Sequence, residues 1–130
     1  MLDYKRFILL IGSFLLLSNL GTSQTYLDTV YYEHDTSQIY RIMELSTETK
    51  EPAGQWLEYH PSGPLKLRCA KVGEGFQGEY QMLYENGQLQ KHFSYEKEKI
   101  HGSYQVYYQD GSKKLMANYR AGNVDGKWIS

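Results

Sequence analysis

Glycines recur in this 130-residue chain at a constant interval of 24 residues, and this interval limits the possible folds more than any other feature of the sequence. An aromatic residue follows each repeat glycine two positions later, and a second glycine follows nine positions after each of the first three. A fixed period of this length is typical of repeat proteins, in which each unit packs on its neighbours. The repeat glycines are Gly54, Gly78, Gly102 and Gly126; the aromatic residues are Trp56, Tyr80, Tyr104 and Trp128; the second glycines are Gly63, Gly87 and Gly111.

Each unit has the pattern of one β-hairpin. Tyr104, Val106 and Tyr108 alternate with more polar residues, which is the period of a strand and not of a helix. Asp110-Gly111 follows this segment, and Asn-Gly or Asp-Gly is a strong hairpin signal because the turn needs a positive φ. A second alternating segment then returns. The sequence therefore predicts an all-β antiparallel meander with three repeats, at 54–77, 78–101 and 102–125, and a partial fourth at 126–130.

The segment before the first repeat is less regular. Val30-Tyr31-Tyr32 and the following Asp35-Thr36-Ser37 resemble residues 106–108 and 110–112 of the third repeat. Residues 24–53 are therefore expected to form a degenerate N-terminal capping hairpin and a loop, since terminal repeats are often atypical. The polar stretch from Glu44 to Pro52 is expected to be that loop.

Residues 1–23 have the order of a cleavable secretory signal. Lys5 and Arg6 precede an 11-residue run, mostly apolar, at 7–17, and a short stretch of mainly small polar residues follows. The run is shorter than the roughly 20 apolar residues of a spanning helix, although an uncleaved N-terminal anchor is the alternative. We expect cleavage between Ser23 and Gln24 and a secreted or periplasmic protein.

The repeats resemble the MORN-type repeat, in particular the bacterial MORN-variant family described as antitoxin-like. The best copy, GSYQVYYQDGSKKLMANYRAGNVD, runs from Gly102 to Asp125. The first copy departs from the pattern, since His60 and Lys71 stand where the other copies have Tyr. The resemblance implies a single-layer, curved sheet of stacked hairpins, used in similar proteins to contact proteins or lipids.

Several chemistries are not expected. Fourteen basic against fifteen acidic residues leave no basic surplus for nucleic acid. Gly73 to Gly78 spells G-x-G-x-x-G, but an alternating strand follows it where a dinucleotide site needs a helix, so no cofactor is expected. The four histidines have no metal-ligand spacing, and no catalytic constellation is visible, so we predict neither a metal site nor an enzyme. His92 and His101 are expected to be solvated.

The single cysteine, Cys69, aligns with Phe93 and Ala117 on the apolar side of the return strands. It is expected to be a buried thiol, with pairing between two chains as the alternative.

One face of the predicted sheet collects the repeated aromatic side chains, while carboxylates such as Glu58, Glu79 and Glu85 are expected on the opposite, polar face. A lone sheet cannot leave a large apolar surface exposed, so this face either coils into a closed core or forms a groove for a partner. The prediction is a non-catalytic domain that binds a protein or peptide, in the manner of an immunity-type or antitoxin-like inhibitor. The alternative is a structural envelope-associated element contacting glycan or lipid. The candidate partner-binding residues are Trp56, Tyr80, Tyr104, Tyr107 and Trp128.

Overall fold

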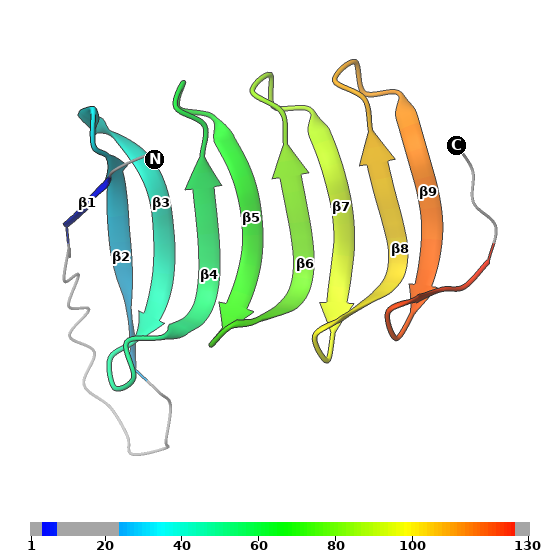
Figure 1. The fold of residues 1–130 in the computed structure, drawn as a ribbon, viewed down its shortest axis with the longest axis horizontal. Helices are drawn as coiled ribbons and strands as arrows, with labels where there is room; N and C mark the ends of the chain where they lie inside the picture. The colour runs from blue at the N-terminus through cyan, green and yellow to red at the C-terminus, as the bar shows by residue number, and fades with distance from the viewer. Residues whose placement is uncertain (1–3, 8–23, 127–130) are drawn as a thin grey trace.

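The computed structural model describes residues 4–7 and 24–126, which form one sheet of ten antiparallel strands in chain order (Figure 1). Every strand pairs with its neighbours in sequence, and the strands lie side by side in a single layer and bend in the same sense. No helix occurs in the described part of the chain. The predicted all-β, single-layer, curved meander of stacked β-hairpins is therefore confirmed.

The repeats coincide with the hairpins. The first repeat supplies β4 and β5, the second β6 and β7, and the third β8 and β9, while the short β10 pairs with β9. Turns at 73–74, 97–98 and 121–122 join one hairpin to the next. The strand bounds are Pro52–Tyr59 for β4, Leu65–Val72 for β5, Gly75–Leu83 for β6, Leu89–Glu96 for β7, Lys99–Tyr107 for β8, Lys113–Arg120 for β9 and Asn123–Val124 for β10.

The N-terminal cap consists of β2 (Thr25–Tyr32) and β3 (Asp35–Ser46), and β1 (Tyr4–Phe7) pairs with β2. The expected loop from Glu44 to Pro52 is wrong at both ends, because only residues 47–51 lie outside the strands. The carboxylate of Glu44 accepts hydrogen bonds from the Thr25 hydroxyl at 2.6 Å and from the Gln55 backbone N–H at 3.1 Å. These bonds tie the polar end of β3 to both neighbouring strands.

The three hairpin turns are built identically. In each turn, the residue before the turn accepts a hydrogen bond from the glycine three positions later, as Tyr84 does from Gly87 at 2.9 Å. Gly87 has a φ of 81°, a conformation that a side chain makes unfavourable. Gly63 and Gly111 hold the equivalent positions with φ values of 105° and 83°. Glycine at this spacing is therefore a requirement of the turn.

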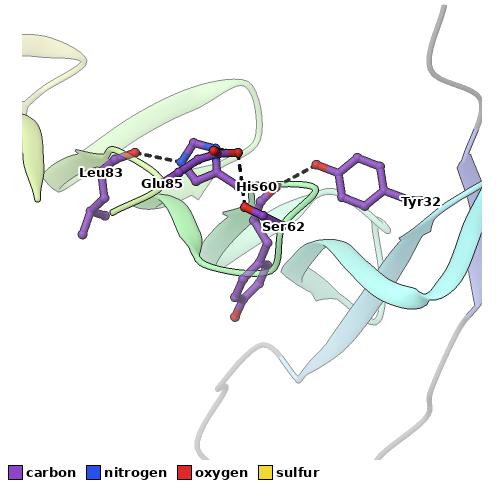
Figure 2. Close-up of polar contacts among 6 residues, drawn as sticks. Tyr32, His60, Ser62, Leu83 and Glu85 are labelled. Atoms are coloured by element: carbon purple, nitrogen blue, oxygen red, sulfur yellow. Dashed lines mark hydrogen bonds and ion pairs between the residues drawn. The ribbon is translucent and has the colours of Figure 1, made fainter. Parts of the chain in front are cut away.

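A ladder of side-chain hydrogen bonds joins each hairpin to the next at the end of the strands that precedes these turns. The Tyr32 hydroxyl donates to the backbone oxygen of Tyr59 at 2.8 Å, and the Tyr84 hydroxyl donates to that of Tyr107 at 3.0 Å. Between them, Nε2 of His60 lies 3.0 Å from the backbone oxygen of Leu83, which can only accept, so Nε2 carries the proton (Figure 2). Tyr32, His60 and Tyr84 thus occupy one slot, so the cap shares this contact with the first two repeats.

The core lies on one side of the sheet and is densest at the cap. Val30, Met43 and Leu45 are buried there and pack against partly buried rings that include Trp56. Further along the sheet the buried apolar residues are more widely spaced: Leu67 and Cys69 lie on β5, Phe93 on β7 and Ala117 on β9. The sheet therefore becomes less covered towards β9.

Candidate partner-binding surface

The apolar side of the sheet is organised in rows that run across the strands; we call this side the aromatic face. Strand pairing places Tyr80 opposite Phe93, and Tyr104 opposite Ala117. The Phe93 ring stacks on Tyr80 at 4.7 Å and on Tyr104 at 5.1 Å between centroids, and Tyr104 meets Tyr119 at 5.4 Å. The rings thus form a continuous ladder along β6–β9, held by offset aromatic contacts.

The structure brings three of the five predicted site residues together. Trp56, Tyr80 and Tyr104 lie on the aromatic face, on β4, β6 and β8. Tyr107 does not join them: its hydroxyl donates to Gln105 at 2.9 Å on the opposite face. Trp128 lies outside the described residues and remains a prediction.

The aromatic face is hollowed at its C-terminal end, over β8 and β9. The cavity has a volume of about 380 Å³, within the range of small ligand sites. Tyr108, one of its lining residues, is 50% exposed. We call this cavity the β8–β9 hollow, and it is lined by Tyr104, Val106, Tyr108, Lys114, Leu115 and Tyr119.

Glu58 lies on the aromatic face, so its predicted place on the polar face is wrong. The Trp56 indole Nε1 donates to the Glu58 carboxylate at 3.0 Å, and Arg41 Nε lies 3.7 Å from the same oxygen. The Arg41 guanidinium also lies 4.5 Å from the Trp56 ring centroid, and the Lys71 ammonium lies 4.5 Å from it as well. A charged group around Trp56 therefore adjoins the apolar packing of this ring against the core of the cap.

Other lysines join the same face. Pairing places Lys91 opposite Met82 on one side and Val106 on the other, within the row that holds Leu67 and Leu115. The Lys114 ammonium lies 5.3 Å from the Tyr108 ring centroid. Alternation of apolar and polar residue types does not reveal these positions. The 24-residue period does indicate them, because it aligns Glu58 with Met82 and Lys91 with Leu67, which lie on the aromatic face.

Burial raises the pKa of three groups on the aromatic face. Desolvation raises the pKa of the Tyr80 and Tyr95 hydroxyls, and it raises the pKa of the Cys69 thiol to about 11. Cys69 is 5% exposed, which confirms the predicted buried thiol. A protonated, buried thiol is a poor nucleophile and behaves as a small apolar side chain.

The remaining motifs have structural explanations. Gly73 to Gly78 spans a turn and the start of β6, where Gly78 has a φ of 66° beside a shift in strand register. His92 is less solvated than predicted, since its Nε2 is buried and lies 4.0 Å from the Glu79 carboxylate. Across residues 4–7 and 24–126, no group of three potential ligands is placed to hold a metal ion. The same residues contain no helix of the length and apolar character needed to cross a membrane.

Comparisons of the chain with protein-family models, with curated proteins and with solved structures found no match. The resemblance to the MORN-variant repeat therefore rests on the sequence pattern and remains a prediction.

Proposed function

We propose that this protein is an exported, non-catalytic repeat domain that binds a protein or peptide through its aromatic face. The observation that carries the proposal is the β8–β9 hollow, which adjoins the half-exposed ring of Tyr108 on a face that no other described element covers. Tyr is well suited to such a surface because its ring packs while its hydroxyl hydrogen-bonds. An antitoxin-like inhibitor is the specific form that the repeat pattern favours.

The architecture also supports binding over a purely structural role. The ring ladder of β6–β8 fixes Tyr104 from one side, so the wall of the hollow is rigid before any partner arrives. A preformed site loses less side-chain entropy on binding than a surface that must be ordered.

The test is capture of a partner by the tagged mature protein from the periplasmic and secreted fractions of its native cells, combined with two matched variants. Tyr108→Ala should lose the captured protein, while Tyr107→Ala, on the opposite face, should retain it. The free energy of unfolding of both variants should lie within about 1 kcal/mol of that of the wild type, as expected for partly exposed positions. Equal capture by the two variants would contradict the proposal.

The envelope-associated alternative gives a different result in the same experiment. A domain that contacts glycan or lipid would be recovered with envelope material whose association survives protease treatment. If protease treatment of the cell fraction abolishes the capture that depends on Tyr108, the result supports the proposal that the partner is a protein or peptide.

A further inference from the structure

We infer that the segment bound by the aromatic face is acidic, with a bulky apolar side chain that enters the β8–β9 hollow beside one of its carboxylates. This inference rests on the proposed function and adds the chemistry of the partner. The net charge of the chain, −1, gives no hint of it, because a net charge does not show on which face the charged side chains lie.

Each return strand contributes one cation to the aromatic face. Arg41 comes from β3, Lys71 from β5, Lys91 from β7 and Lys114 from β9. Of the acids, Glu58 lies in the row that runs from Arg41 across the sheet to Leu115, and the buried Asp28 lies opposite Met43 in the cap. The face therefore has a cationic surplus that an acidic ligand would complement.

Glu58 does not neutralise the three lysines. Its carboxylate is engaged by Trp56 Nε1 at 3.0 Å and faces Arg41 at 3.7 Å, and the Glu58 and Arg41 side chains are only 19% and 17% exposed. Within the described chain, none of Lys71, Lys91 and Lys114 has a salt bridge. Lys71 and Lys114 lie instead over aromatic rings, which leaves their ammonium groups able to pair with incoming carboxylates.

The spacing suits an extended peptide that crosses the strands. Lys91 and Lys114 come from the alternate strands β7 and β9, about 9.5 Å apart, and lie at nearly the same level along them, since Lys91 shares a row with Leu115. Lys71 lies further along β5, opposite Gly54 and Phe76. Three residues of extended chain span about 10 Å, so acids three positions apart would match Lys91 and Lys114. Lys114 borders the β8–β9 hollow, so an apolar side chain next to the last acid would reach the cavity. A membrane would use the charge but not a discrete apolar hollow.

The test is calorimetric titration of the protein with the peptide Ac-Glu-Ser-Ser-Glu-Ser-Phe-Glu-NH2 and three relatives. These replace the Glu residues by Gln, the Glu residues by Lys, or Phe by Ser. We expect the acidic peptide to bind most tightly and each replacement to weaken binding. The affinity should also fall between 50 and 300 mM salt, because exposed charges are screened.

Two pairs of protein variants locate the contacts. Lys114→Gln should weaken the binding of the acidic peptide about three- to fivefold, the usual effect of one exposed ion pair. Lys113→Gln should leave the affinity unchanged, because Lys113 is next to Lys114 in the chain but does not line the hollow. Lys91→Gln should likewise weaken binding, whereas Lys66→Gln should not, since Lys66 lies on β5, away from the β8–β9 hollow.

The outcomes separate this inference from the proposed function. Equal affinity for the Glu and Gln peptides, or no binding of the Glu peptide at millimolar concentration, overturns the acidic-partner inference even if a Tyr108-dependent protein is captured. Binding to phosphatidylglycerol vesicles in place of the peptide overturns it in favour of an anionic membrane. Loss of Tyr108-dependent capture with retained peptide binding would instead contradict the proposed function alone.

Discussion

The hydroxyl of Tyr84 donates a hydrogen bond to the backbone oxygen of Tyr107, which belongs to the next hairpin of the sheet. His60 and Tyr32 make the same connection one and two hairpins earlier, so this slot joins successive hairpins by a side-chain bond in addition to strand pairing. The period of the sequence is thus matched by a period of side-chain bonds between units.

Tyr84→Phe should therefore lower the free energy of unfolding by about 0.5–1.5 kcal/mol, the net contribution of a typical hydrogen bond. Tyr108→Phe is the matched control, because no hydrogen bond of its hydroxyl is found among the described residues. Chemical denaturation of both variants gives the comparison. Equal stabilities for the two variants would show that the Tyr84 bond does not hold the hairpins together.

Phe93 is the central ring of the ladder and is 5% exposed. Phe93→Ala should destabilise the protein by about 3–5 kcal/mol, as truncation of a buried aromatic side chain does. Phe93→Leu keeps an apolar side chain and loses the stacking on Tyr80 and Tyr104, so its cost should be about 1–3 kcal/mol. A Phe93→Ala variant that unfolds at the denaturant concentration of the wild type would contradict the ladder as the core of β6–β8.

The hairpin turns give a prediction in acid. Ser112 donates to the Asp110 carboxylate from its hydroxyl at 2.6 Å and from its backbone N–H at 2.9 Å, and these bonds hold the pKa of Asp110 below its ordinary value of 3.8. A carboxylate whose pKa is lower in the folded state stabilises the fold above the unfolded pKa, and this contribution is lost as the pH falls through the folded pKa.

Asp110→Asn should accordingly be less stable than the wild type at pH 7 and equal to it in strong acid, where both side chains are neutral. In a protein that also carries Ser112→Ala, the loss of stability caused by Asp110→Asn at pH 7 should be smaller, because the hydrogen bond from the Ser112 hydroxyl to Asp110 is already absent. Denaturation curves at pH 7 and pH 2 measure this. A difference that is unchanged at pH 2 would rule out the ionised Asp110 as its source.

Cys69 should be unreactive in the native protein. Its thiol is buried with a pKa of about 11, so a disulfide reagent at pH 8 should label it only after unfolding. Above pH 9 the unfolded thiol ionises first, and stability should fall as the pH rises towards 11. Cys69→Ala should reduce this alkaline loss. Rapid labelling of the native protein, or a disulfide-linked dimer on a non-reducing gel, would contradict the buried thiol.

Much of the fold could be predicted from the sequence because its signals are local. Gly87 and Gly111 mark turns that require a positive φ, and the alternation around Tyr80 and Tyr104 sets the face of each strand. The place of Glu44 within a strand was not predicted, because its strand is stabilised there by hydrogen bonds to Thr25 and Gln55, which lie on the two neighbouring strands.

The candidate site was predicted less completely. Trp56, Tyr80 and Tyr104 were found from the repeat, but Glu58 was expected on the polar side because polar residues usually lie there, and Lys91 was not singled out. Their positions depend on register, and Glu58 is tolerated on the aromatic face because Trp56 and Arg41 provide its partners. Such compensation between strands cannot be derived from alternation alone.

The central claim is that the aromatic face is an open binding surface at β8–β9 and not a closed core. The most direct measurement is the fluorine photo-CIDNP signal of 3-fluorotyrosine placed at position 108, recorded for the free protein and for its complex with the captured partner. The free protein should give a strong signal, since Tyr108 is 50% exposed, and the complex should lose it. A free protein without that signal, or a complex that keeps it in full, would contradict the account.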